Sequence, residues 1–211
     1  MTRTAPYEAH AARYDAWFDQ NQAAYVSELL ALRPFVPVQG LGLEVGVGTG
    51  RFAAPLGVRV GLDPARAMLA RAHARGIEVV QAAAESLPFA DDTFDHALAV
   101  TTICFVDSPL TMLGEARRVL KPGGRLVIGF IDRSSELGRF SMARRRQSVF
   151  YADAIFYSAA EVEALLLAGG YGIESCGQTL SGLPAEVRQI EPLQPGHGNG
   201  GFVVVAARSC K

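Results

Sequence analysis

The stretch from residue 40 to residue 131 alternates between two spacings of hydrophobic and polar positions. Short apolar runs, such as those at 41–45 and 58–62, are followed by segments whose apolar residues recur every three or four positions. The first spacing is typical of a strand, and the second is typical of a helix that buries one face. Connections this short join parallel strands and place helices on both faces of the sheet, so the pattern predicts a parallel α/β core.

Five strands are expected in this core, with turns and helices between them. The expected strands are 41–45, 58–62, 77–80, 97–100 and 125–131. The expected helices are 52–56, 64–76 and 109–120. Pro64 is expected to start the second of these helices, because proline is favoured at the first helical position. The sequence Lys-Pro-Gly-Gly at 121–124 is expected to end the third.

Both ends of the chain carry elements outside this core. Residues 7–32 are predicted to form a helix rich in aromatic residues, which either packs on the domain or acts as a lid over a pocket. A polar and basic insert at 134–157 precedes a helix that starts with a capping box at Ser158. Two further strands, 173–180 and 202–207, have no crossover helix between them and are expected to pair antiparallel. We therefore expect an α/β fold, a three-layer Rossmann-like sandwich with a mostly parallel seven-stranded sheet and an antiparallel C-terminal hairpin.

Composition narrows the classes of partner. The 211 residues, 49% of them hydrophobic, suffice for one core, and the net charge of −1 gives no electrostatic reason to expect nucleic acid as a partner. Three scattered cysteines without metal-type spacing favour a reducing compartment and no metal site. The polar N-terminus lacks the apolar core of a signal peptide, and no apolar run approaches the roughly 20 residues that a membrane span needs. We therefore expect a cytoplasmic protein that binds neither membrane nor nucleic acid.

Three glycines at alternate positions follow the first strand, within LGLEVGVGTGR. Gly46, Gly48 and Gly50, here called the glycine turn, tolerate positive φ and have no side chain, so the backbone there can approach a ligand closely. Ligands in parallel α/β sheets bind beyond the carboxyl ends of the strands, where the strand order reverses. Asp63 and the threonine pair that starts at Thr101 fall at the same ends. The sequence therefore predicts a binding site at this edge of the sheet.

Four motifs in this order resemble those of the class I S-adenosylmethionine-dependent methyltransferases, of the small-molecule type similar to methyltransferase domain 11. They are LEVGVGTGRF, the LD that ends the second strand, AAAESLPFADDTFD and VLKPGGRLVI. The resemblance covers residues 40–131, and the expected terminal hairpin suits that family's extra antiparallel strand. It implies an enzyme that uses S-adenosyl-L-methionine to methylate a small-molecule acceptor.

The resemblance also implies how the chain is organised. Residues 1–211 are expected to form a single methyltransferase domain. Its expected parts are an N-terminal helical lid (1–38), a cofactor-binding core (39–131), a substrate-side insert and helix (132–170) and a C-terminal β-hairpin (171–211). The choice of acceptor is expected to depend on the lid and the insert.

Several residues acquire a cofactor-binding role from the resemblance. The glycine turn, with Val47 inside it, is expected to pass close to the methionine and ribose portions of the cofactor, and Glu44 suits its α-ammonium group. Asp63 is expected to accept both ribose hydroxyls, or to cap the helix that follows it. Tyr14 occupies a place where relatives bring an aromatic ring over the methionine end, and otherwise it is a packing residue. Thr101 follows the fourth strand, where relatives place residues near the sulfonium, and otherwise it reflects strand propensity.

The adenine side is expected to involve the start of the second helix and the turn after the third strand. Pro64 and Met68 would line the adenine, and Ala84 and Glu85 would meet its edge, mainly through backbone groups. Glu85 alternatively ties this turn by hydrogen bonds to the backbone. Many relatives carry an aspartate where Ala83 stands, so adenine recognition here must rest on other groups.

Two other functions remain open from the residues. Similar glycines occur in NAD(P)-dependent Rossmann oxidoreductases, but that fingerprint is G-x-G-x-x-G, and Arg51 stands where the third glycine would fall. Glu44 beside the glycines also suits an ammonium group better than a pyrophosphate. A non-catalytic methyltransferase-like partner subunit would share the fold without the activity.

The implied reaction is an in-line displacement at the methyl group of a sulfonium, for which the protein supplies alignment and exclusion of water. The sequence assigns no catalytic residue or general base, and it identifies neither the acceptor nor the oligomeric state. Phe105, Phe150 and Tyr151 suggest an apolar pocket wall. Arg139 and the arginines at 144–146 either bind a carboxylate or phosphate of the acceptor or form a solvated face.

Overall fold

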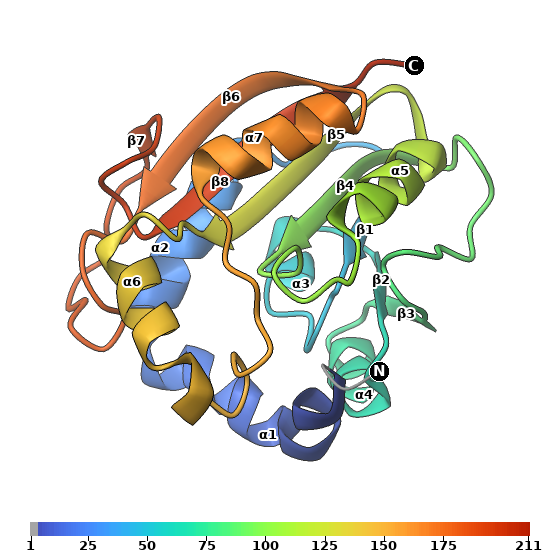
Figure 1. The fold of residues 1–211 in the computed structure, drawn as a ribbon. Helices are drawn as coiled ribbons and strands as arrows, with labels where there is room; N and C mark the ends of the chain where they lie inside the picture. The colour runs from blue at the N-terminus through green and yellow to red at the C-terminus, as the bar shows by residue number, and fades with distance from the viewer. Residues whose placement is uncertain (1–3) are drawn as a thin grey trace.

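The computed structural model describes residues 4–211, which form an eight-stranded sheet in the order β3-β2-β1-β4-β5-β8-β6-β7 (Figure 1). The strands are β1 (Gly42–Val45), β2 (Val60–Asp63), β3 (Glu78–Gln81), β4 (Phe94–Val100), β5 (Leu120–Ile131), β6 (Tyr171–Thr179), β7 (Gln194–Pro195) and β8 (Phe202–Ser209). Strands β1 to β5 pair in parallel, and β8 pairs antiparallel with both β5 and β6. The mostly parallel α/β sheet and the antiparallel C-terminal strands are therefore confirmed.

The strand order reverses at β1, which lies between β2 and β4. Val45 at the end of β1 is paired with Leu62 of β2, and Glu44 is paired with Leu98 of β4. All four residues of β1 are buried, because helices cover both faces of this part of the sheet. The chain leaves β1 and β4 toward opposite faces, which is the arrangement that forms a ligand-binding crevice in α/β sheets.

Helices cover both faces of the sheet (Figure 1). One face carries α5 (Pro109–Val119) and α7 (Ala159–Ala168), and the other carries α2 (Gln22–Leu32), α3 (Ala53–Leu56) and α4 (Arg66–Ala74). Beyond the carboxyl ends of the parallel strands lie α1 (Ala5–Gln20), α6 (Glu136–Ala143) and the short helix η2 (Arg145–Gln147).

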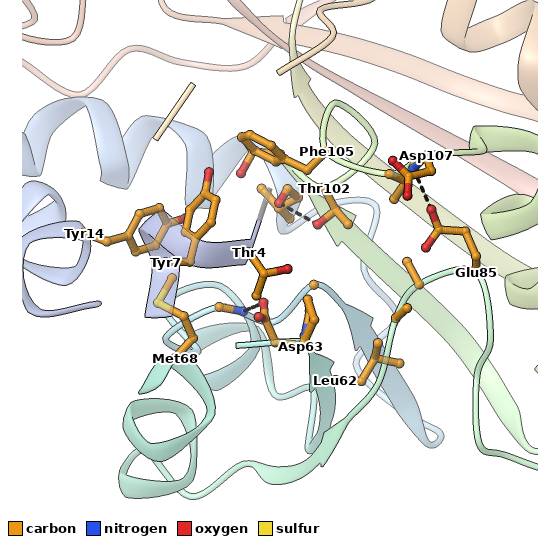
Figure 2. Close-up of a pocket in the computed structure, with 18 of the residues that line it drawn as sticks. Thr4, Tyr7, Tyr14, Leu62, Asp63, Met68, Glu85, Thr102, Phe105 and Asp107 are labelled. Atoms are coloured by element: carbon orange, nitrogen blue, oxygen red, sulfur yellow. Dashed lines mark hydrogen bonds between the residues drawn. The ribbon is translucent and has the colours of Figure 1, made fainter. Parts of the chain in front are cut away.

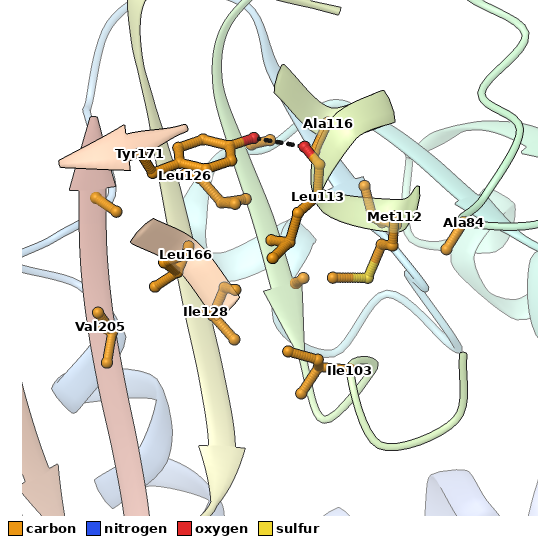
Figure 3. Close-up of a cluster of buried hydrophobic side chains, with 14 of the residues drawn as sticks. Ala84, Ile103, Met112, Leu113, Ala116, Leu126, Ile128, Leu166, Tyr171 and Val205 are labelled. Carbon is orange, nitrogen blue, oxygen red and sulfur yellow. Dashed lines mark hydrogen bonds between the residues drawn. The ribbon is translucent and has the colours of Figure 1, made fainter. Parts of the chain in front are cut away.

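One hydrophobic core joins α5 and α7 to the sheet (Figure 3). Leu113 of α5, Leu166 of α7 and Ile128 of β5 are each fully buried. The ring of Tyr171 lies in the same core, and its hydroxyl donates to the carbonyl oxygen of Leu113 at 3.0 Å. This packing holds β4 and β5 in place, so that their carboxyl ends form a fixed edge.

The N-terminal helix differs from its prediction. The helix expected over 7–32 is two helices, because the chain turns at Asn21. The backbone N–H of Asn21 makes the last helical hydrogen bond, to the carbonyl oxygen of Trp17 at 2.9 Å. Its side-chain amide donates to the same oxygen at 2.9 Å and caps the end of the first helix. The first three residues of the predicted lid, 1–3, lie outside the described residues.

The helix expected to start at Pro64 begins at Arg66 instead. The carboxylate of Asp63 accepts the backbone N–H of Ala65 at 2.8 Å, which bends the chain just before the helix. Asp63 therefore ends β2 and shapes the entry to α4.

The sheet also exceeds its prediction at two places. Residues 121–124, expected to break the chain after the third helix, belong to β5, where Gly123 adopts a φ of +69°. The two-residue strand β7 adds an eighth strand beside β6. The first difference lengthens β5 inside the sheet, and the second adds a strand at its edge.

Within residues 4–211, no helix is both long and apolar enough to cross a membrane, and the longest, α1, has 16 residues. The same residues contain no group of three or more His, Cys, Asp or Glu side chains that could hold a metal ion.

Candidate functional site

A cavity of about 230 Å³ opens at the carboxyl ends of β1, β2 and β4, below α1 (Figure 2). Most of the predicted site residues line it, namely Tyr14, Gly46, Gly48, Asp63, Pro64, Met68, Ala84, Glu85 and Thr101. Further lining residues are Thr4, Tyr7, Leu62, Ala83, Val100, Thr102, Phe105, Val106, Asp107 and Tyr151. The structure therefore brings the separate sequence motifs together around one space.

The backbone of the glycine turn forms one wall of the cavity. Gly46 and Gly48 have φ values of +74° and +51°, in the left-handed region that favours glycine. A Cβ atom at Gly46 would collide with the hydroxyl of Thr102, which donates to the carbonyl oxygen of Val45 at 3.0 Å. A Cβ atom at Gly48 would lie 3.6 Å from Cε of Met68, on the cavity side. A side chain at either position would therefore fill or distort the wall.

The third glycine serves packing rather than the cavity. Gly50 has a φ of +79°, and a Cβ atom there would lie 3.1 Å from Cα of Ala72 in α4. The side chain of Val47 is buried against Gly61, where a Cβ atom would lie 2.6 Å from Cγ2 of that valine. Gly50 and Val47, both predicted to contact the cofactor, therefore do not line the cavity. They hold the glycine turn between α4 and β2.

Asp63 is fixed on the cavity wall by two backbone groups. One carboxylate oxygen accepts the N–H of Gly48 at 3.1 Å, and the other accepts the N–H of Ala65 at 2.8 Å. Burial raises the pKa of Asp63 to about 6, although these two hydrogen bonds favour the charged form. Each carboxylate oxygen has a second lone pair, so the group can still accept hydrogen bonds from a ligand.

Glu44 lies beneath the glycine turn and does not line the cavity. Its side chain is 1% exposed, and Oε2 has no hydrogen-bond partner among the described residues. Burial raises the pKa of Glu44 well above its usual value, although a hydrogen bond from the N–H of Ala53 lowers the pKa in part. A buried acceptor without a partner carries a cost of at least about 1 kcal/mol, which a nearby cation relieves.

The carboxylate of Glu85 ties two loops together at the far end of the cavity. Its Oε1 accepts the N–H of Asp107 at 2.6 Å and the N–H of Ser108 at 3.4 Å (Figure 2). The alternative prediction for Glu85, that it holds the turn through backbone hydrogen bonds, is therefore confirmed. Ala83 and Ala84 lie beside it on the wall and offer backbone groups to a ligand.

Tyr14 and Thr101 meet at the other end. Both side chains line the cavity, and Thr101 adopts a φ of +50°, which is unusual for a β-branched residue. Burial raises the pKa of Tyr14, and the nearby charges of Asp63, Glu44 and Glu28 raise it further. The phenol of Tyr14 therefore stays neutral at ordinary pH.

Five aromatic rings, here called the aromatic roof, close this end: Tyr7, Tyr14, Phe105, Phe150 and Tyr151. The ring of Tyr7 lies 5.3 to 5.6 Å from those of Tyr14, Phe105 and Phe150, and Phe105 stacks on Tyr151 at 5.7 Å. The hydroxyl of Tyr7 donates to the carbonyl oxygen of Phe150 at 3.3 Å. The roof thus joins α1, the loop after β4 and the insert after α6, and it gives this end of the cavity an aromatic wall.

The charges on the cavity wall have a single sign. Asp63, Glu85 and Asp107 are the charged side chains among the described lining residues, and that lining contains no lysine, arginine or histidine. The arginines predicted to hold an anionic acceptor lie elsewhere, since Arg145 donates to the carbonyl oxygen of Ala154 at 3.1 Å and Arg144 stacks on Phe140. The cavity therefore favours a cationic ligand.

Some lining residues were not identified from the sequence. Leu62 and Val100 lie at the carboxyl ends of two predicted strands, so their position in the sequence could have identified them as lining residues. Thr4, Val106 and Asp107 lie outside every motif, and only the folded chain brings them to the cavity.

Comparison with known proteins finds relatives over the whole chain. A family model described as a methyltransferase domain matches residues 43–128. An uncharacterized protein of Methanocaldococcus jannaschii is 43% identical over 201 residues, which are 95% of this chain and 97% of that protein. An uncharacterized protein of Mycobacterium tuberculosis is 41% identical over 93% of this chain and 71% of its own length.

A solved structure from Thermotoga maritima, described as a SAM-dependent methyltransferase and possible histamine N-methyltransferase, is 42% identical to this chain. It superposes with a TM-score of 0.95, covering 99% of this chain and 100% of its own. Its likeness therefore extends beyond the parallel core to the helices at the N-terminus and the segment after β5.

Proposed function

The chain belongs to the class I S-adenosylmethionine-dependent methyltransferases, and we propose that it transfers the methyl group to the amine nitrogen of a small molecule. The observation that carries the cofactor assignment is the Asp63 carboxylate, which is fixed on the cavity wall within 3.1 Å of the glycine-turn amide of Gly48. Methyltransferase activity and its cofactor follow from the family. The residues that hold the cofactor and the acceptor are our proposal.

The described residues fit a cofactor that carries two positive charges and a ribose. The cavity wall is acidic, and the unpartnered Oε2 of Glu44 beneath the glycine turn suits an ammonium group nearby. Asp63 would accept the ribose hydroxyls, and the backbone at Gly48 would lie against the cofactor, because a side chain there would fill the space. A pyrophosphate would meet repulsion from the same carboxylates, so the wall does not favour a nicotinamide dinucleotide.

The remaining cavity residues divide into an adenine end and a methionine end. Pro64, Met68 and Ala84 would line the adenine, with backbone groups of the turn at Ala83 replacing the absent aspartate. Tyr14 and Thr101, which both line the cavity, would lie at the methionine end. Gly50 and Val47 would support this site through packing alone.

When bound, S-adenosylmethionine supplies a methyl group on a sulfonium that is already an activated leaving group. The chain contributes orientation and exclusion of water, and such effects are worth several kcal/mol. The aromatic roof covers the end where Thr101 and Tyr14 lie, so it would hold the acceptor against the methyl group in a dry space. No side chain is assigned as a general base.

The proposed division of the chain follows from these roles. Residues 1–38 would act as the lid, 39–131 as the cofactor-binding core, 132–170 as the acceptor-side insert and helix, and 171–211 as the closing hairpin. The lid and the insert both contribute rings to the aromatic roof, so both would select the acceptor.

An amine acceptor is supported by the acidic wall and by the relative from Thermotoga maritima, whose description names histamine as a possible acceptor. Other relatives are named for different acceptors, including a quinone C-methyltransferase that matches 57% of this chain and 54% of its own length. The relative from Thermotoga maritima, which matches over its full length, is therefore the better guide to the acceptor.

Isothermal titration calorimetry with S-adenosylmethionine and with NADH tests the cofactor, and formation of S-adenosylhomocysteine with histamine tests the reaction. Binding of S-adenosylmethionine alone and turnover of histamine are expected. Binding of NADH alone would overturn the cofactor assignment. Binding of neither would favour a non-catalytic partner subunit.

A further inference from the structure

A second, smaller cavity lies behind the aromatic end of the main one. Its volume of about 10 Å³ leaves room for no more than about one water molecule. Among the described residues, Thr101 and Tyr151 line both cavities. The other walls of the small cavity are mainly apolar and include Ile103, Phe130 and Phe156, which are all buried. Thr101 and Tyr151 therefore separate the proposed site from an apolar space behind it.

The ring of Tyr151 is the aromatic part of this partition. It stacks on the ring of Phe105 at a centroid distance of 5.7 Å and an interplanar angle of 27°. It also lies 5.6 Å from the ring of Phe156, at an interplanar angle of 34°. Phe105 lines the main cavity, and Phe156 lines the small one. The ring of Tyr151 therefore lies between a ring of one cavity and a ring of the other.

Hydrogen bonds hold the backbone at Tyr151 in place. Its N–H donates to Oγ of Ser148 at 3.0 Å, and its carbonyl oxygen accepts the N–H of Ala154 at 3.1 Å. The N–H of Ile155 donates to the carbonyl oxygen of Cys104 at 2.8 Å, which ties the insert to the loop after β4. The ring of Tyr151 is therefore a fixed wall between the two cavities.

The main cavity has little space for an acceptor. Its volume of about 230 Å³ lies below the roughly 300–1,000 Å³ of a typical site for a drug-sized molecule. The same space must hold the cofactor, so an acceptor with a long apolar group would meet the ring of Tyr151. The apolar walls behind that ring would stabilise such a group, but the ring blocks the way to them.

We infer that Tyr151 determines the size of the acceptor, because its ring admits an amine with a compact apolar group and excludes a longer one. The inference rests on the proposed methyl transfer to an amine and assigns a specificity-determining residue to its acceptor side. Removing the ring joins the two cavities, and a longer apolar group then gains contact with Phe130 and Phe156. The ring rather than the hydroxyl fills the space, so phenylalanine would serve in its place.

Two amines of different length test the inference, phenethylamine and 4-phenylbutylamine, titrated by calorimetry into protein saturated with S-adenosylhomocysteine. The two additional methylene groups strengthen binding about tenfold where a site has room for them. The wild-type protein should instead bind the shorter amine more tightly, by about tenfold, because the longer one meets a fixed ring. In Tyr151→Ala the order should reverse, with the longer amine bound about tenfold more tightly than the shorter one.

Three further variants make the comparison specific to the ring of Tyr151. Tyr151→Phe keeps the ring and should keep the wild-type order of the two amines. Phe150→Ala removes the neighbouring ring of the aromatic roof, which lines neither of the two cavities, and it should keep that order as well. Tyr151→Val leaves a smaller void than alanine does, so it repeats the test if Tyr151→Ala does not fold. Binding of S-adenosylmethionine shows that each variant is folded.

Each other result counts against a stated premise. A wild-type protein that binds S-adenosylmethionine but prefers the longer amine would overturn the inference and leave methyl transfer intact. Folded variants without the ring that keep the wild-type order would do the same, as would a reversal in Phe150→Ala or binding of neither amine. Failure of the wild-type protein to bind S-adenosylmethionine would remove the proposed function and this inference with it.

Discussion

Nε of Arg51 donates to Oδ1 of Asp15 at 2.9 Å, so the residue that follows the glycine turn is tied to the first helix. The Asp15 side chain is only 10% exposed, and Arg75 reaches the same carboxylate at 2.9 Å. Burial raises the pKa of Asp15, but the hydrogen bonds from Arg51 and Arg75 hold it well below its usual range. Arg51 also pairs with Asp19, whose side chain is 68% exposed. A partly buried ion pair therefore fastens α1 to the glycine turn.

Replacing Asp15 with Asn should loosen this attachment. Arg51, Arg71 and Arg75 would all lose a charged partner, so we expect a loss of about 2 kcal/mol in the free energy of unfolding. Affinity for S-adenosylmethionine should fall as well, because Tyr14 lies on the same helix next to the cavity. Denaturant unfolding and calorimetric titration measure the two effects.

Asp19→Asn is the matched control for that experiment. It removes the same charge from an exposed pair with the same arginine, and exposed ion pairs contribute little to stability. Equal losses in the two variants would mean that the buried pair at Asp15 has no special part in holding the lid.

Asp63 should make cofactor binding dependent on pH. Its carboxyl group titrates with a pKa of about 6 in the free protein, and only the ionised form accepts hydrogen bonds at both oxygens. Affinity for S-adenosylmethionine should therefore fall by up to about tenfold for each pH unit below 6. Calorimetry between pH 5 and 8 should show a flat, weaker profile for Asp63→Asn. A wild-type profile without any change near pH 6 would exclude Asp63 from the ribose contact.

Substitutions at two positions of the glycine turn should affect cofactor binding and stability to different degrees. Gly48→Ala places a methyl group on the cavity side, 3.6 Å from Cε of Met68, so it should reduce cofactor affinity about tenfold or more. Its left-handed backbone should cost about 1 kcal/mol of stability, with the fold retained. Gly50→Ala places a methyl group 3.1 Å from Cα of Ala72, in contact with backbone that cannot yield. We expect this second variant to lose about 2 kcal/mol of stability. Thermal unfolding with and without cofactor distinguishes the two, and a reversed pattern would contradict the assigned roles.

The buried carboxyl of Glu28 should lower stability as the pH rises. Burial raises its pKa from the ordinary 4.5 to about 8, so the folded protein binds the proton more tightly than the unfolded chain does. The free energy of unfolding should therefore decline between pH 4.5 and 8, by on the order of a few kcal/mol, relative to Glu28→Gln. Tyr14 and Tyr151, which lie near this carboxyl, stay neutral over that range because their pKa values are raised. Parallel stability curves for the two proteins would show that Glu28 is not buried as described.

Periodicity and turn residues were enough to predict the parallel core. The runs that became β1, β2 and β4 are apolar and bounded by glycine or polar residues, so local sequence and tertiary packing agree there. The helix boundaries that differ from the prediction depend on hydrogen bonds between a single side chain and the backbone. Asn21 ends α1 and Asp63 delays α4 through hydrogen bonds that no periodic pattern reports.

Site residues could be predicted where their position at a strand end decides their role. They were harder to predict where tertiary packing decides which side chains face the cavity. Gly48 and Asp63 fall at strand ends and are identified by position. Gly50 follows Gly48 by two residues in the same turn, yet it packs on α4, because only the fold decides which side of the turn faces the cavity. Glu28 lies in a helix whose apolar residues predict simple packing, so its burial could not be foreseen.

The order of strands across the sheet has a consequence for how the chain is made. β8 lies between β5 and β6, although it follows both in the sequence. The ribosome synthesises the chain from its N-terminus, so β5 and β6 both emerge before β8, the strand that pairs with each of them. Until β8 emerges, β6 has only the two-residue β7 as a neighbour, and β5 has one unpaired edge. Until residues 202–209 emerge, those edges and the apolar surface that Val203 and Val205 later cover are available to other chains. The antiparallel half of the sheet is thus completed late. Until then its open strand edges are the part of the chain that a chaperone would shield.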